Sequence, residues 1–197
     1  MGVILHSRYA RTFSERVIER YEKFQRLIRE KEGKVNGSGA ILQEKDISSG
    51  ELEVTNFSCG EISIQLKSCV RRHNVHLFCQ FRQGSRGNND NQYINIHEDI
   101  AEVGLLLDTL KRSRVDSISL YMPFIPYLRQ DKKAGDREPI SAKNLFSQLE
   151  ASGGRVLKGF ATSDMHNNAC EGFTDLPVDK IAAFPLFELY YKVKLAE

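Results

Sequence analysis

The sequence has no tryptophan, no long apolar run and almost no net charge. Its formal charge of +2 is the difference between 28 basic and 26 acidic side chains, so no global field favours nucleic acid or a membrane surface. The apolar stretches 103–107 and 118–126 are far shorter than a membrane-spanning helix, and Met1 is not followed by the segments of a signal peptide. We therefore expect a cytoplasmic protein without nucleic-acid or membrane partners, in which any anion site is local.

Cysteine is also scarce, and its spacing argues against a structural zinc site. The sequence contains no C-x-x-C pair and no histidine at zinc-finger spacing from its four cysteines, Cys59, Cys69, Cys79 and Cys170. We expect reduced and mostly buried thiols, as in other intracellular proteins.

Strand-like and helix-like segments alternate along most of the 197 residues. Strand patterns occur at 3–6, 51–56, 62–66, 75–81, 117–124 and 155–161. Helical patterns occur from Thr12 to about Gly33, at 100–112, from Ser141 as a candidate cap to 153, and at 185–195. This order predicts a single α/β domain with a parallel sheet and helices on both faces. Residues 34–50, rich in glycine and serine, are predicted to be a flexible insertion.

A cluster of charged and polar side chains follows the strand at 117–124. It comprises Arg129, Gln130, Asp131, Lys132 and Lys133. Open α/β sheets bind ligands at the carboxyl ends of their strands, and arginine can form paired hydrogen bonds with phosphate oxygens. The run therefore indicates a site for a phosphate-rich ligand, with a solvated surface turn as the alternative.

Carboxylates and an imidazole follow the next strand along the chain. Asp164 and His166 come first, and Asp175 and Asp179 lie in or beside the turn-like stretch 172–178. Oxygen ligands suit Mg²⁺, and a nucleotide-bound Mg²⁺ needs only one or two protein ligands. The alternative is a histidine that only forms hydrogen bonds.

A tight turn between the strand patterns 51–56 and 62–66 presents an aromatic ring and a carboxylate. Its notable residues are Phe57, Cys59, Gly60 and Glu61. The ring could stack on a base and the carboxylate could accept a hydrogen bond from an exocyclic amine. The alternative is a hairpin turn with a packed phenylalanine and no binding role.

Four motifs in order resemble the amino-terminal half of the ribose-phosphate pyrophosphokinases, also called phosphoribosyl pyrophosphate synthetases. NFSCGEISIQL is similar to the family's F-S-D-G-E turn, and YLRQDKKAGDREPISAKNL to its A-R-Q-D-[RK]-K loop and the helix start that follows. SDMH is similar to D-L-H, and GFTDLPVD to G-F-F-D-[IV]-P-V-D. The resemblance covers the chain from about Glu51 to its end and implies a phosphoribosyltransferase-like (type I) fold.

The resemblance implies a function and a role for each candidate residue. The family converts ATP and ribose 5-phosphate into phosphoribosyl pyrophosphate and AMP with Mg²⁺. By resemblance, Arg129 and Gln130 bind ATP with Asp131, Lys132 and Lys133 in the same loop, and Asp164 and His166 bind the metal with Asp175 and Asp179 as further candidates. Phe57, Gly60 and Glu61 are implied in adenine recognition, commonly across a subunit interface, with Cys59 where the family has aspartate.

The resemblance also leaves two functional readings open. The segment KGFATS is longer than the family's connection at that point, and nothing after Asp179 resembles the family's catalytic loop or its ribose-phosphate loop. We therefore expect the ATP-binding half of a synthetase, with the carboxyl-terminal half absent, that forms a homo-oligomer or assembles with synthetase subunits. The alternative is a non-catalytic regulatory subunit of such a complex. A phosphoribosyltransferase would carry an acidic pair before a Thr/Gly-rich phosphate loop, which this sequence lacks.

Overall fold

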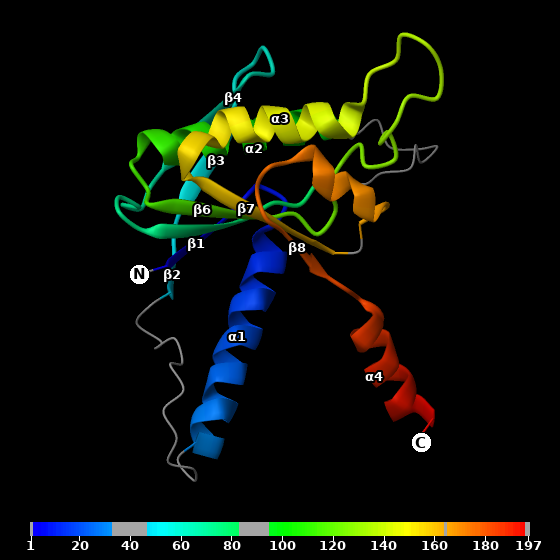
Figure 1. The fold of residues 1–197 in the computed structure, drawn as a ribbon. Coiled ribbons are helices and arrows are strands. Elements are labelled where there is room, and N and C mark those ends of the chain that lie inside the picture. Colours follow the sequence, from blue (N-terminus) through cyan, green and yellow to red (C-terminus); the bar gives the residue numbers. More distant parts are fainter. Residues whose placement is uncertain (1, 33–46, 83–94, 164, 196–197) are drawn as a thin grey trace.

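A six-stranded parallel sheet forms the centre of the computed structural model, which describes residues 2–32, 47–82, 95–163 and 165–195 (Figure 1). Every strand pair in this sheet is parallel. In spatial order the strands are β2 (Ile47–Ser49), β1 (Gly2–His6), β5 (Asn74–Phe78), β6 (Ser117–Tyr121), β7 (Leu157–Ser163) and β8 (Val178–Ile181). The predicted α/β class with a parallel sheet is confirmed.

The central strands are apolar because helices cover them, as is usual in parallel sheets. Leu5 of β1, Leu77 of β5 and Leu120 of β6 are all fully buried. The edge strand β8 is instead largely exposed, and Ile181 at its end is 59% accessible.

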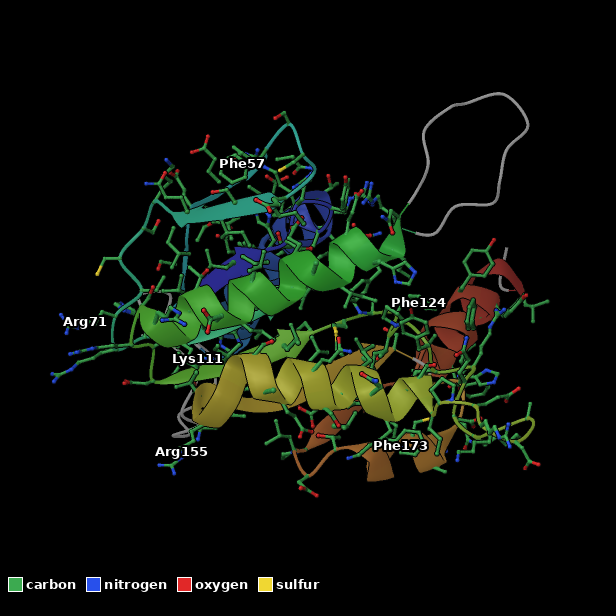
Figure 2. All side chains as sticks on the ribbon, turned by 90° about the horizontal axis from the view of Figure 1, so that it is seen from above. Phe57, Arg71, Lys111, Phe124, Arg155 and Phe173 are labelled. Atoms are coloured by element: carbon green, nitrogen blue, oxygen red, sulfur yellow. The ribbon has the colours of Figure 1, made fainter. Side chains whose placement is uncertain are left out.

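Two helices pack side by side on one face of the sheet, α2 (Ile96–Arg112) and α3 (Ser141–Gly153) (Figure 2). The Asn95 side chain caps α2 by accepting a hydrogen bond from the backbone N–H of His97, 3.1 Å away. The buried apolar residues of α2 are Val103, Leu106, Leu107 and Leu110, and Phe146 of α3 packs edge-on against Phe160 of β7. These contacts make the two helices a firm base for the loops at their ends.

The other two helices, α1 (Arg11–Glu32) and α4 (Phe184–Leu195), extend from the opposite face (Figure 1). The start of α1 contacts the sheet, where the ring of Phe13 lies 5.8 Å from that of Phe78, and Phe78 stacks on Tyr121. Helices therefore lie on both faces, as predicted. The exposed large apolar side chains of α4 are Phe184, Phe187, Tyr190, Tyr191 and Leu195.

A separate antiparallel hairpin, β3 (Leu52–Asn56) and β4 (Ile62–Leu66), packs beside α2. Ile64 and Leu66 of β4 contact the main core. The two strands pair in register from Leu52 with Leu66 to Asn56 with Ile62, so the hairpin presents its turn at one end.

Several expectations need correction. Residues 47–49 were predicted to lie in a flexible insertion but form the edge strand β2, while 34–46 lie outside the described residues. The strand predicted from residue 155 begins at Leu157, after a 3₁₀ turn, η2 (Gly154–Val156). The predicted turn-like stretch 172–178 lies between two elements that the sequence did not indicate, the 3₁₀ helix η3 (Asn168–Phe173) and the strand β8, and overlaps the end of the first and the start of the second.

The cysteines follow the prediction only in part. Cys79 and Cys170 are buried, whereas Cys59 and Cys69 are exposed, and all four are free thiols. Within the part of the chain that the structure describes, no helix is long and apolar enough to cross a membrane.

Candidate functional site

The loop between β6 and α3 carries the predicted phosphate-binding residues at the carboxyl edge of the sheet. Its first turn is closed by the backbone N–H of Gln130, which donates to the carbonyl oxygen of Tyr127 at 2.8 Å. Tyr127 adopts a left-handed backbone conformation (φ 63°), which costs a residue with a Cβ atom about 1–2 kcal/mol. The hydroxyl of Tyr127 lies 3.0 Å from Nδ1 of His97 in the first turn of α2. This contact ties the start of the loop to a rigid helix.

Gln130 attaches the other side of the turn to α3. Its backbone carbonyl accepts a hydrogen bond from the N–H of Ala142 at 3.3 Å, and its side-chain carbonyl accepts one from the hydroxyl of Ser141 at 2.5 Å. Ser141 is thus the first residue of α3 and not its cap, since Ile140 occupies the cap position. Gln130 acts here as a fixed anchor of the loop.

Three of the cations in this loop are available to an anion. Arg129, Lys132 and Lys133 are exposed and form no ion pair with any residue that the structure describes. A loop fixed at Tyr127 and Gln130 therefore carries three exposed cations that are not held in ion pairs by described side chains, which suits a phosphate-rich ligand.

Asp131 connects this loop to the segment after β7. Its Oδ2 accepts a hydrogen bond from the side-chain amide of Asn167 at 2.7 Å. That bond lowers the pKa of Asp131 below its usual value, and the charges of Lys132 and His166 add to the effect. The structure thus places His166 near the charged loop, although the two segments follow different strands.

The predicted metal ligands are less closely grouped. His166 and Asp175 are exposed, Asp164 lies outside the described residues, and Asp179 lies on β8 opposite Ala161. Burial raises the pKa of Tyr121, and the negative charge of Asp179 raises it further. Asp179 therefore interacts with a tyrosine of the sheet. Among the described residues there is no cluster of three or more His, Cys, Asp or Glu that could hold a metal ion alone. A metal ion held by these described residues would need further ligands, such as the oxygens of a bound polyphosphate.

The hairpin turn presents Phe57 to solvent. This residue is 57% exposed, so the alternative of a packed phenylalanine is wrong. The N–H of Gly60 donates to the carbonyl of Phe57 at 2.9 Å, and the φ of 92° at Gly60 explains why glycine occupies this position. The N–H of Phe57 donates in turn to the carbonyl of Glu61 at 2.8 Å, and Cys59 is exposed at the tip.

The hairpin turn and the charged loop lie apart in one chain (Figure 1; Figure 2). A cavity of about 480 Å³ separates Gly60 and Glu61 of the turn from the first turns of α2, where His97 forms part of its wall. No hydrogen bond or ion pair between described residues joins 57–61 to 129–133. The structure therefore brings the charged loop and the segment of His166 together, but not the hairpin turn.

Arg8, two residues after the end of β1, holds the base of the hairpin. Its Nη2 donates to Oδ1 of Asn56 at 2.7 Å, one residue before Phe57. The backbone N–H of Arg8 donates to Oε1 of Glu102 in α2 at 2.7 Å, and its Nε lies 3.3 Å from Oε2. Burial raises the pKa of Glu102, while the hydrogen bond and charge of Arg8 oppose that shift.

Sequence reasoning missed the residues that position the site. His97, Arg8 and Asn167 lie outside the quoted motifs. Tyr127 opens the segment YLRQDKKAGDREPISAKNL but was given no role there, because its partner His97 lies thirty residues away. Their usable signals were adjacency to candidate residues: Asn167 directly follows His166, and Tyr127 lies two residues before Arg129.

Comparison with known proteins identifies the family. A family model described as the N-terminal domain of ribose phosphate pyrophosphokinase matches residues 4–153. This chain belongs to the ribose-phosphate pyrophosphokinase family. It is 34% identical over 151 residues to ribose-phosphate pyrophosphokinase 1 of Streptococcus agalactiae, covering 77% of this chain and 42% of that protein. It is 32% identical over 158 residues to the Bacillus caldolyticus ribose-phosphate pyrophosphokinase, covering 80% of this chain and 45% of that protein.

The structural comparison agrees on the fold. Phosphoribosylpyrophosphate synthetase of Mycobacterium smegmatis superimposes with a TM-score of 0.73 at 23% identity, over 96% of this chain and 51% of that one. The chain spans less than half the length of the two pyrophosphokinases above, and its matched region corresponds to their family's N-terminal domain.

Proposed function

We propose that this chain is the ATP-binding half of a ribose-phosphate pyrophosphokinase. In the proposed reaction the diphosphoryl group of ATP passes to ribose 5-phosphate, giving phosphoribosyl pyrophosphate and AMP. The carrying observation is the junction at Asp131 and Asn167, which sets a loop of unpaired cations beside His166 at the carboxyl ends of β6 and β7.

Phosphoryl-type transfer depends on positioning and charge neutralisation more than on a protein nucleophile, so a chain that mainly binds and orients ATP fits this chemistry. Arg129 would bind the phosphate oxygens, with Lys132 and Lys133 as additional charge, and Gln130 would hold the loop in place. Mg²⁺ would be the metal that neutralises the polyphosphate, with His166 and Asp164 as the protein's candidate ligands.

The adenine site is proposed to require a second copy of the chain. Phe57, Gly60 and Glu61 lie away from the charged loop of their own chain, so a base held by the hairpin turn of one copy would place its phosphates on the loop of another. Ribose 5-phosphate would bind outside the motifs present here, since this sequence has no acidic, Thr/Gly-rich phosphate loop. A synthetase polypeptide or further domain would supply that site.

The proposal is tested by calorimetric titration of the protein with Mg-ATP. Arg129→Ala should weaken binding at least about tenfold, because a hydrogen bond to a charged group contributes roughly 1.5–3 kcal/mol. Arg155→Ala is the matched control: Arg155 is also exposed, and it lies at the opposite end of α3 (Figure 2). No heat with Mg-ATP, or equal loss in both variants, would exclude this site.

The regulatory alternative is separated by a second measurement. If the chain co-purifies with a full-length synthetase whose activity is unchanged by Arg129→Ala in this chain, the chain is a non-catalytic partner. Loss of activity in that complex would support the catalytic reading.

A further inference from the structure

The contact between Tyr127 and His97 joins two elements that the motifs treat separately. Tyr127 lies two residues before Arg129, and its hydroxyl lies 3.0 Å from Nδ1 of His97, thirty residues earlier in the chain. The two rings are tilted by 35° with their centres 6.1 Å apart, so the contact is a hydrogen bond and not a stack. Among the described residues, it is the side-chain hydrogen bond that links this part of the loop to α2.

The backbone of Tyr127 makes this link consequential. A bulky residue at a φ of 63° is uncommon and persists where surrounding contacts hold it. The same residue provides the carbonyl that accepts the N–H of Gln130, and Gln130 in turn accepts the N–H of Ala142 in α3. If the Tyr127 side chain lost its contact with His97, both backbone hydrogen bonds that shape the turn around Arg129 should therefore weaken.

His97 also faces the other candidate segment. It forms part of the wall of the cavity beside Gly60 and Glu61, and of a longer groove of about 1050 Å³ between α2 and α3 that Tyr127 and Ser141 also line. The imidazole thus lies between the hairpin turn and the charged loop.

We propose that Tyr127 and His97 are a positioning pair that fixes the loop of Arg129 and Gln130 in the conformation that receives the phosphates of a nucleotide. The fixing of the loop is a property of the free protein, whereas its use for phosphate binding rests on the proposed function. The two parts have separate tests.

The first test measures amide hydrogen exchange in the free protein. Tyr127→Phe and His97→Leu remove one partner each and should speed exchange at Gln130 and Ala142 about three- to tenfold, the range for one lost hydrogen bond. His97→Asn should restore slow exchange, because the asparagine oxygen can occupy the position of Nδ1. Tyr190→Phe, which removes an exposed hydroxyl from α4, is the matched control and should change neither amide.

Two results of this experiment would overturn the pair. One is unchanged exchange at Gln130 and Ala142 in both Tyr127→Phe and His97→Leu. The other is an equal rise at the amide of Leu120 in the buried strand β6, which would indicate general destabilisation in place of a local release.

The second test uses tripolyphosphate as a probe without a base. Its Kd should rise about three- to tenfold in Tyr127→Phe and His97→Leu and return toward the wild-type value in His97→Asn. If wild-type protein binds tripolyphosphate and the variants bind it equally well, the pair has no role in ligand binding. If wild-type protein binds neither tripolyphosphate nor Mg-ATP, the proposed function fails, while the exchange result still decides the pair.

Discussion

Glu102 holds Arg8, which in turn binds Asn56 at the base of the hairpin. Replacing Glu102 should show how much of this attachment depends on charge and how much on hydrogen bonding. The Glu102 side chain is only 3% exposed, and it accepts the backbone N–H of Arg8 while its second oxygen faces Nε of the same residue. Glu102→Gln keeps an oxygen for the backbone N–H and removes the charge. Glu102→Leu removes both.

The expected cost follows from these contacts. In Glu102→Gln the ion pair with Nε of Arg8 is lost, and the hydrogen bond from the backbone N–H of Arg8 changes from a charged one, worth about 1.5–3 kcal/mol, to a neutral one, worth about 0.5–1.5 kcal/mol. Against this, the cost of burying a carboxylate disappears. We expect a net loss of about 0–2 kcal/mol at pH 7. Glu102→Leu also leaves the N–H of Arg8 without an acceptor, which adds roughly 1–3 kcal/mol.

The pH dependence tests the sign of the reasoning. Burial raises the pKa of folded Glu102 above that of the unfolded chain, about 4.3, so this residue's contribution to stability is complete below pH 4 and is lost as the pH rises through the folded pKa. The disadvantage of Glu102→Gln should therefore shrink between pH 4 and pH 8 in urea unfolding. If that disadvantage grows with pH, the attraction of Arg8 outweighs burial and the reasoning is wrong.

Two further predictions test the burial and the site. In the folded protein, Cys59 and Cys69 should react with a thiol reagent at pH 8, whereas Cys79 and Cys170 should react only in urea. The reason is that Cys79 and Cys170 are buried, and burial raises the pKa of both thiols. Rapid modification of four thiols without denaturant would contradict the fold. Asn167→Ala should raise the pKa of Asp131 toward its ordinary value, because the hydrogen bond from the Asn167 amide is the main cause of the lowered pKa. On acidification, the stability that Asp131 contributes should therefore be lost at a higher pH in the variant than in the wild type. An unchanged titration of the Asp131 carboxylate by NMR would refute the link between the two segments.

The sequence predicted the parts of the fold that have a long and regular pattern. The apolar strands β1, β5 and β6 and the helices α2 and α3 were found because each buries a whole face or stripe. β2 was missed because its three residues, Ile47 to Ser49, are short and partly polar, and they become a strand only by pairing with β1. β8 was missed for a similar reason, since its exposed residues pair only with the edge of β7.

The candidate site was predictable as a list of residues and not as an arrangement. The strand before it placed the charged loop at the carboxyl edge, which the structure bears out. The bond of Asp131 to Asn167 and that of Tyr127 to His97 depend on loop paths with no periodic signal. The same limit applies to Phe57, whose exposure depends on how the hairpin packs against α2.

Helix α2 explains how two exposed segments can be held by one rigid element. Its buried leucines, among them Leu106 and Leu107, fix the helix on the sheet. From that base Glu102 holds Arg8, which holds Asn56 before the hairpin turn, while His97 holds Tyr127 before the charged loop. The two attachments lie on neighbouring turns, so the separation between the hairpin turn and the loop is set by the helix more than by either segment. A second copy that brought its own loop to this hairpin would then meet a turn already fixed in place, and the ordering cost of assembling the proposed site would be reduced.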